Sequence, residues 1–235
     1  MLLFSFFNFG FWLASFELPT QKKEKNKELI YLIPSYFPSI TYYSHIVNFE
    51  VNFNISMKYQ KQTTRNRCVI MSANGPLKLI IPVKQNNKEN EDLHDYRARI
   101  DSSKNWKLKH WKSIQNAYRS SPFFEFYEDD FSKVFFNKEK LLYSLNLRII
   151  SHINKILGLK KEMEISTQKI GYQKYNNGVM DIKKYFNYRV PEYNQVFMSK
   201  FKFTPNLSIL DLLFNLGPKS LNYLSNLKFN QFHKN

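Results

Sequence analysis

Glycine is scarce in this chain, with 6 residues in 235. No glycine-rich phosphate loop and no dinucleotide-binding fingerprint occurs, and the HExxH, CxxC and serine nucleophile-elbow motifs are also missing. These absences exclude the protein classes that bind phosphate with the backbone amides of a glycine-rich turn. Any phosphate bound by this chain must therefore be held by side chains.

Cysteine occurs once, as Cys68, which rules out an intramolecular disulfide framework and is compatible with a reducing compartment. Neighbouring arginines can lower a thiol pKa, but the apolar residues that follow favour a small buried core residue at this position. The other candidate ligands, the histidines outside the helix discussed below, lack metal-ligand spacing (His45, His94, His152, His233). The sequence predicts neither a metal site nor a cofactor.

Acidic residues are outnumbered, 19 against 35 basic ones, which gives a formal net charge of +16. Such a surplus predicts attraction to anions: nucleic acid, acidic lipid headgroups, or sugar phosphates and nucleotide sugars. Many basic residues stand singly among asparagine and tyrosine, so a lysine- and asparagine-rich composition explains much of the charge. The aromatic content of 17% excludes a wholly disordered chain, and the length suits one domain with a sizeable core.

The chain begins with an apolar segment, Met1 to Leu18, followed by the charged run Lys22 to Lys25. This segment is at the lower limit for spanning a hydrocarbon layer of about 30 Å, and it lacks the basic start and the cleavage site of a secretory signal. Three interpretations remain open: a weak membrane anchor, an interfacial segment, or a misassigned start. We therefore treat residues 1–28 as an extension, 29–228 as the domain and 229–235 as a tail.

Strand and helix signals alternate at the start of the domain. Leu29 to Ile33 is an apolar run ended by Pro34, and Pro38 opens a short helical stretch. Phe49 to Ile55 alternates apolar and polar residues, which is the period of a half-buried strand. The sequence thus predicts a strand–helix–strand opening.

A hairpin is predicted next, because Asn74-Gly75 separates the apolar runs Val69–Met71 and Leu77–Val83 and both turn residues tolerate positive φ. Gln85 to Asp95 is polar and charged, so we expect a loop there. Tyr96 to Ile100 is expected to add one more strand.

Helices dominate the second half. We expect Ser102 or Ser103 to cap a helix that ends near Tyr118, and Asn137 to Leu157 has the period of a long amphipathic helix stopped by Gly158. A further strand and two helices complete the prediction, at Glu164–Thr167, Ser208–Phe214 and Lys219–Leu227. The fold class is α/β or α+β: a single domain with a small mixed sheet packed against several helices.

The most informative short segment is Tyr59 to Arg67, a basic run with three cations that lies between two core-bound runs. Because both flanks fix its backbone, its side chains are expected to converge on a ligand. Arg65 and Arg67 can each offer a planar fork of donors to a phosphate or carboxylate. Lys61 adds a third cation, and Tyr59 and Asn66 complete the substrate-binding set predicted here. The alternative is a solvated basic hairpin edge.

The helix after Asn105 presents an aromatic, apolar face that carries His110 between Trp106 and Trp111. Burial there would keep the imidazole neutral, as a general base needs near pH 7. We therefore name His110 as the candidate catalytic base, Trp106 and Trp111 as stacking platforms, and Lys109 as a further binding residue. A buried structural histidine is the competing interpretation.

Acidic residues at three places in the sequence are candidates for capping, ion-pair or catalytic roles. Asp101 either caps this helix or orients His110 or an arginine of the basic run, and capping is favoured. Glu128 to Asp130 are interpreted as helix-end charges or ion-pair partners at a helix start before Phe131. Asp211 lies among leucines and needs a polar partner, for which we expect Arg65 or Arg67.

Several motifs in order resemble the WbqC-like family of bacterial proteins, from about Tyr31 to about Pro218. They are Tyr36-Phe37-Pro38-Ser39-Ile40, Tyr59-Gln60-Lys61-Gln62, Arg65-Asn66-Arg67, Ile100-Asp101, Asn105-Trp106, Lys109-His110-Trp111-Lys112-Ser113, Ser121-Pro122-Phe123-Phe124, Tyr127-Glu128-Asp129-Asp130 and Pro205-Asn206-Leu207-Ser208-Ile209-Leu210-Asp211-Leu212-Leu213-Phe214.

This resemblance implies a cytoplasmic role in bacterial surface-polysaccharide (O-antigen, lipopolysaccharide) biosynthesis. It also implies transfer of a glycyl or acyl group to an amino sugar or nucleotide sugar, with an anionic small molecule as the partner. The alternative is a basic nucleic-acid-binding protein, although no specific nucleic-acid motif is present. Peripheral contact with the inner face of the membrane through residues 1–28 is a third expectation.

Overall fold

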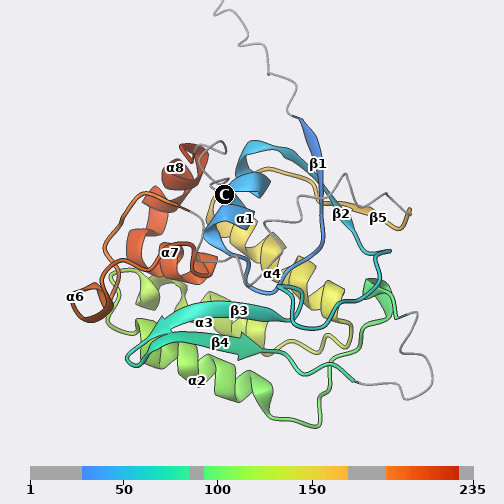
Figure 1. The fold of residues 1–235 in the computed structure, drawn as a ribbon, viewed down its shortest axis with the longest axis horizontal. Helices are drawn as coiled ribbons and strands as arrows, with labels where there is room; N and C mark the ends of the chain where they lie inside the picture. Colours follow the sequence, from blue (N-terminus) through green and yellow to red (C-terminus); the bar gives the residue numbers. More distant parts are fainter. Residues whose placement is uncertain (1–27, 85–92, 169–188, 228–235) are drawn as a thin grey trace, which may run out of the picture.

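A computed structural model describes residues 28–84, 93–168 and 189–227. In it the parallel strands lie beside the first helix (Figure 1). Strand β1 (Leu29–Leu32) pairs with β2 (Glu50–Asn54), and β2 pairs with β5 (Glu164–Ser166), all in parallel. Helix α1 (Ile40–Asn48) connects β1 to β2. The predicted strand–helix–strand opening is confirmed.

The hairpin forms a second, two-stranded sheet of β3 (Arg67–Ser72) and β4 (Gly75–Ile80). Gly75 at the turn has a φ of +103°, which a side chain would disfavour. Helix α2 (Trp106–Tyr118) runs alongside the hairpin (Figure 1) and is bonded to it at both ends. The amide of Met71 donates to the hydroxyl of Tyr118 (3.3 Å), and the amide of Ile80 donates to His110 (3.2 Å).

Helix α4 (Leu142–Ile156) lies next to α1 near the centre of the molecule (Figure 1). The Tyr43 hydroxyl of α1 donates to Asn154 Oδ1 of α4 at 2.7 Å. Gly158 follows α4 with a φ of +70°, as predicted for its stop, but the helix begins at Leu142 rather than at Asn137. The remaining helical elements are α3 (Phe124–Phe135), α6 (Met198–Phe201), α7 (Ile209–Leu216), α8 (Ser220–Ser225), and the 3-10 turns η1 (Asp95–Arg97) and η4 (Gly217–Lys219).

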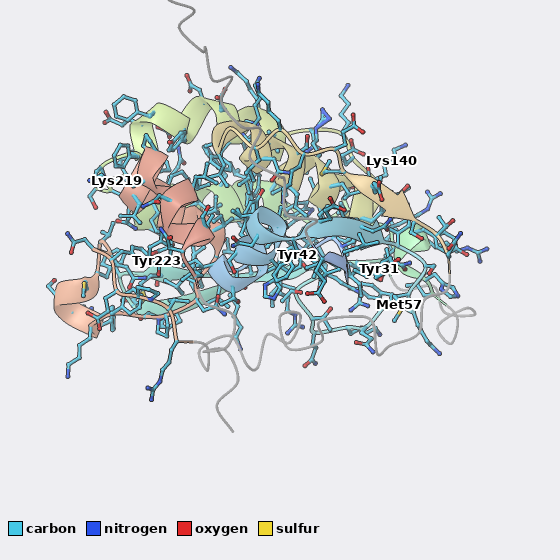
Figure 2. All side chains as sticks on the ribbon, turned by 90° about the horizontal axis from the view of Figure 1, so that it is seen from above. Tyr31, Tyr42, Met57, Lys140, Lys219 and Tyr223 are labelled. Atoms are coloured by element: carbon cyan, nitrogen blue, oxygen red, sulfur yellow. The ribbon has the colours of Figure 1, made fainter. Side chains whose placement is uncertain are left out.

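Aromatic rings fill much of the core. Phe37 stacks on Phe135 with ring centroids 5.8 Å apart, and Phe214 contacts Phe124 at 5.1 Å. Figure 2 shows side chains filling the space between the elements, with buried Tyr42 near the middle and exposed Lys140 and Lys219 further out. The predicted single α/β domain is confirmed, and its parallel and antiparallel strands lie in two separate sheets.

Three local predictions differ from the structure. Tyr96 to Ile100 forms no strand: its first two residues belong to η1, and its last two make only isolated bridges, Arg99 with Leu141 and Ile100 with Val83. The N-cap of α2 is Asn105, because Ser103 is bonded to Asp101 instead. Glu128 to Asp130 lie within α3 rather than at its start.

No helix within the described ranges is both long enough and apolar enough to cross a membrane. The predicted extension (apart from Glu28) and the tail at 229–235 lie outside those ranges. So does most of Gly171 to Asn194, a stretch rich in tyrosine, asparagine and lysine for which the sequence predicts no element.

Candidate functional site

The basic run is held at both ends by backbone hydrogen bonds. At its start, the Tyr59 amide donates to the Leu93 carbonyl (2.6 Å). At its end, the Ile81 amide donates to the Asn66 carbonyl (2.8 Å), and Asn66 Nδ2 donates back to the Ile81 carbonyl (2.9 Å). The loop is therefore positioned by segments that lie far from it in sequence.

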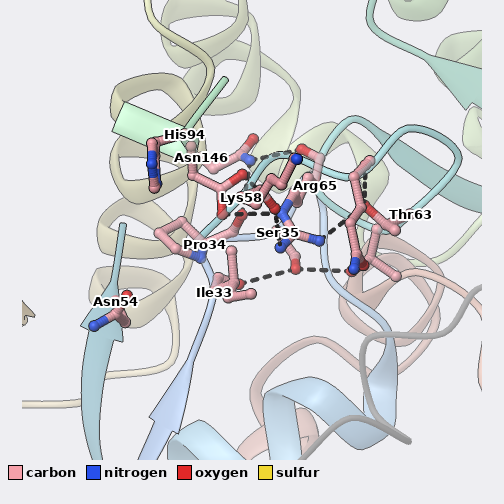
Figure 3. Close-up of polar contacts among 12 residues, drawn as sticks. Ile33, Pro34, Ser35, Asn54, Lys58, Thr63, Arg65, His94 and Asn146 are labelled. Atoms are coloured by element: carbon pink, nitrogen blue, oxygen red, sulfur yellow. Dashed lines mark hydrogen bonds and ion pairs between the residues drawn. The ribbon is translucent and has the colours of Figure 1, made fainter. Parts of the chain in front are cut away.

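The two arginines of the run have opposite environments. Arg65 is 4% exposed, and its Nε donates to both carboxylate oxygens of Asp95, at 2.8 and 3.0 Å. Its guanidinium also donates to the Thr63 hydroxyl (3.3 Å) and lies 3.5 Å from the Lys58 carbonyl (Figure 3). Burial raises the pKa of Asp95 to about 6, against the opposing effect of Arg65, so the carboxylate is ionised at neutral pH and balances the guanidinium.

Arg67 instead lines a cavity of about 210 Å³. It stands opposite Ile80 in the β3–β4 register, and its Nε is buried without a hydrogen-bond partner among the described residues. The cavity is lined by polar or charged side chains and by an apolar wall: Tyr59, Lys61, Gln62, Asn66, Arg67 and Lys84, with Ile80, Ile81, Pro82, Val83 and Leu93. No carboxylate occurs among these lining residues, so the cavity suits an anion.

The cavity is small and its tyrosine is neutral. Burial raises the pKa of Tyr59 to about 12, so its hydroxyl keeps its proton at physiological pH. Pockets that enclose drug-sized ligands are typically about 300–1,000 Å³, so this cavity suits one anionic group with a few attached atoms.

His110 lies beside β4 and is not among the residues that line this cavity, and both of its ring nitrogens are engaged. The Ile80 amide can only donate, so Nε2 accepts, and Nδ1 carries the proton and donates to the Tyr36 hydroxyl at 3.0 Å. Burial lowers the pKa of His110 to about 4. The predicted neutral imidazole is thus present, but the lone pair that a general base needs is already occupied by Ile80. This geometry favours the structural interpretation.

The tryptophans beside His110 are also packed inside. Trp106 and Trp111 are 6% and 7% exposed, and they contact His110 (5.2 Å between centroids) and Phe135 (5.8 Å) respectively. Lys109 is exposed on the opposite face of α2. Trp106 also borders a second, more polar cavity of about 400 Å³, formed by residues 102–107 and 137–140. The structure therefore separates Lys109 and both tryptophans from the cavity at Arg67.

The sequence profile of the WbqC-like protein family matches residues 34–185 and 173–223. The chain belongs to this family. It is also similar to an uncharacterized protein of Mycobacterium tuberculosis, Rv1507c, with 22% identity over 219 residues that cover 80% of this chain and 91% of the relative. No solved structure matches the chain.

Two of the WbqC-like motifs meet at one point in the interior. Ser39 and Ser208 are the N-caps of α1 and α7 and face each other in an antiparallel bridge. The Ile40 amide donates to the Leu207 carbonyl (3.0 Å), and the Ile209 amide donates to the Pro38 carbonyl (2.7 Å). These motifs thus hold the first and the last large helices together.

Asp211, within the second of these motifs, forms no ion pair with an arginine. It is fully buried and accepts hydrogen bonds from the hydroxyls of Tyr118 (2.9 Å) and Tyr193 (2.6 Å) and from Gln195 Nε2 (3.0 Å). The expected pairing with Arg65 or Arg67 is wrong, because Asp95 already neutralises Arg65 and neutral donors satisfy Asp211. Burial raises the pKa of Asp211 to about 6, although these hydrogen bonds oppose it.

Asp101 in the WbqC-like domain accepts from the amide and the hydroxyl of Ser103, at 3.0 and 2.6 Å. These bonds lower its pKa. It neither caps α2 nor contacts His110 or an arginine, because its oxygen is used by the adjacent turn.

Two site residues were missed by the sequence analysis, Asp95 and Lys84. The polar pattern predicts Asp95 at the end of a loop, whereas the mixture of apolar and polar residues from Leu93 to Tyr96 indicates that this end of the loop is partly buried. Within the described ranges, no group of three His, Cys, Asp or Glu side chains could hold a metal ion.

Proposed function

We propose that this protein binds the anionic group of a polysaccharide precursor in the cavity at Arg67, during bacterial surface-polysaccharide biosynthesis. The observation that carries the proposal is Arg67 Nε, a buried donor without a partner among the described residues, in a cavity whose described lining residues include three cations and no carboxylate. A buried charged donor left unpaired is costly, so a bound anion at this position would stabilise the protein.

Membership of the WbqC-like family supports the biological setting, and the resemblance implies a transferase. In this proposal, Lys61, Arg67 and Lys84 neutralise the anion, and the Tyr59 hydroxyl offers a neutral donor. The apolar wall formed by Ile80 to Val83 excludes water from one side of the ligand and so strengthens these contacts. Arg65 contributes indirectly, since its pair with Asp95 fixes the loop that carries Lys61 and Arg67.

The test is isothermal titration of the protein with uridine diphosphate and with inorganic phosphate. Loss of a charge-assisted hydrogen bond costs about 1.5–3 kcal/mol, so Arg67→Met should weaken binding by about tenfold or more. Arg119→Met is the matched control. It removes the same charge from an exposed position at the C-terminal end of α2, outside the cavity. Equal affinity of both variants would reject the cavity as the anion site.

A further inference from the structure

The residue before Arg67 also has an unused polar atom in this cavity. Asn66 is 7% exposed and lines the cavity. Its Nδ2 donates to the Ile81 carbonyl at 2.9 Å, and because a carbonyl only accepts, the amide orientation is fixed and Oδ1 is the remaining atom. That Oδ1 is buried and has no hydrogen-bond partner among the described residues.

Other buried asparagines show that this is not general in the protein. Asn54 Oδ1 accepts from the Ser56 amide (3.0 Å), and Asn206 Oδ1 accepts from the Thr41 amide (2.9 Å). Asn146 Oδ1 also lacks a partner, but Asn146 borders a space of about 10 Å³, which holds no more than a single water. Asn66 differs because the cavity beside it is about 210 Å³.

Consecutive residues thus leave one acceptor and one donor unsatisfied in the walls of the same cavity. Each such buried group destabilises the protein if it stays unpaired. A ligand that satisfies both must bring an acceptor, which is the anionic group, to Arg67 Nε. It must also bring a hydrogen-bond donor to Asn66 Oδ1.

The charges around the cavity decide which donor fits. An ammonium group would approach Lys61, Arg67 and Lys84 with only a neutral amide to receive it, and like charges at close range are unfavourable. A hydroxyl donates to the amide without this repulsion. A phosphate, with about −1.5 to −2 charge, also suits three cations better than a carboxylate does.

We propose that the ligand is a hydroxylated phosphate ester of the sugar-phosphate class. Its phosphate lies against Arg67 and the two lysines, and one of its hydroxyls donates to Asn66 Oδ1. This inference rests on the proposed function and narrows it, since it excludes a zwitterion that places its ammonium group at Asn66.

The test uses phosphate esters that differ only at the end of a short chain. The affinities of 2-hydroxyethyl and 3-hydroxypropyl phosphate are compared with those of propyl and butyl phosphate, and 2-aminoethyl phosphate supplies the ammonium group. We expect at least one hydroxylated ester to bind about fivefold or more tightly than its alkyl match, since a satisfied buried acceptor contributes about 1 kcal/mol or more. The ammonium ester should bind no more tightly than propyl phosphate.

Asn66→Ala and Asn66→Ser complete a cycle between the residue and the ligand hydroxyl. The preference for the hydroxylated ester should disappear in both variants and persist in Asn116→Ala, which removes an exposed amide from α2. Ratios taken within one protein cancel a general loss of stability. If neither Asn66 variant folds, the ratio of the affinities of hydroxylated and alkyl esters in the wild-type protein tests the proposal.

The outcomes separate the two proposals. Absence of binding by every ester, or binding that Arg67→Met leaves unchanged, would overturn the proposed function itself. Binding that depends on Arg67 but is equal for hydroxylated and alkyl esters would overturn only the role of Asn66, as expected if a water alone occupies that position. Tightest binding of the ammonium ester would overturn the assignment in favour of a zwitterion.

Discussion

At the residue scale, Arg65 and Arg67 show how little residue type says about role. Both belong to one basic run, yet one is buried against Asp95, whereas the other lines a cavity whose described lining residues include no acid. The sequence correctly located the cluster of cations and indicated that both flanks fix the loop. It could not separate the two arginines, because their difference depends on Asp95, 30 residues away along the chain.

We predict that Arg65→Met destabilises the protein by about 3–5 kcal/mol, since it leaves the Asp95 carboxylate buried without its partner. Arg67→Met should change the free energy of unfolding by less than about 1 kcal/mol, because no ion pair is lost. Urea denaturation of both variants measures this difference. Similar losses in both would contradict the assignment of structural and ligand-binding roles.

His110 gives a prediction for pH. Its folded pKa of about 4 is below the ordinary value of 6.5, so between these two values the unfolded chain binds a proton that the folded protein does not. The stability due to the neutral ring is complete above pH 6.5 and is lost as the pH falls toward 4, by up to about 3 kcal/mol.

His110→Gln should remove this loss. The expected measurement is the free energy of unfolding of both proteins from pH 7 to pH 4, with the stability advantage of wild type shrinking as the pH falls. Asp95 and Asp211 change stability in the opposite sense over this range, because burial raises their pKa values, but they are present in both proteins and cancel in the difference. A difference independent of pH would show that His110 is not buried in its neutral form.

At the element scale, regular hydrophobic patterns predicted whole strands and helices correctly, whereas the predicted helix caps and boundaries were less accurate. The alternation in β2, the Asn-Gly turn of the hairpin and the apolar face of α4 each report on the burial of a whole element. The predicted cap of α2 was wrong because the Ser103 hydroxyl is bonded to Asp101, two residues earlier. Similarly, the start of α3 was missed because its acids mark no boundary: Asp129 and Asp130 are exposed, and Glu128 accepts a hydrogen bond from Gln115 of α2.

The C-terminal end of α1 is stabilised by a lysine that no sequence pattern predicted. Lys161 Nζ donates to the carbonyls of Ile46 (2.6 Å), Val47 (3.0 Å) and Phe49 (2.7 Å). A cation at a helix C-terminus also interacts favourably with the helix dipole.

Lys161→Met should therefore lower the free energy of unfolding by about 1.5–3 kcal/mol, the usual contribution of hydrogen bonds to a charged group. Lys160→Met is the control, since Lys160 is exposed and directly adjacent. Thermal unfolding compares the two, and equal melting temperatures would contradict this role of Lys161.

At the scale of the whole molecule, the fold class was predicted from hydrophobic patterns and the family from motifs in order, whereas the chemistry was not. Most of the motif residues that carried the resemblance are buried in the structure, at the caps of α1 and α7 and around His110. Such motifs report on packing, and the cavity at Arg67 involves only a few of them.

The net charge of +16 leads to a separate prediction about nucleic acid. If the positive charge is dispersed, a random single-stranded oligonucleotide should bind weakly, lose affinity steeply between about 50 and 200 mM salt, and bind Arg67→Met almost as well as wild type. Fluorescence anisotropy at several salt concentrations measures this. Sequence-selective binding that survives high salt would favour a nucleic-acid-binding protein over a polysaccharide-precursor protein.

The contact between Ser39 and Ser208 has a consequence for synthesis in the cell. The Ser208 hydroxyl donates to the carbonyl of Phe37, 171 residues earlier. At translation rates of about 5–20 residues per second, roughly ten to thirty seconds pass between the synthesis of the start of α1 and the synthesis of Ser208. During that interval Tyr36, Phe37 and Ile40, which are buried in the finished protein, cannot complete their packing. A nascent chain arrested before Pro205 should therefore be protease-sensitive at these residues and recruit chaperones, whereas one released after Leu227 should not.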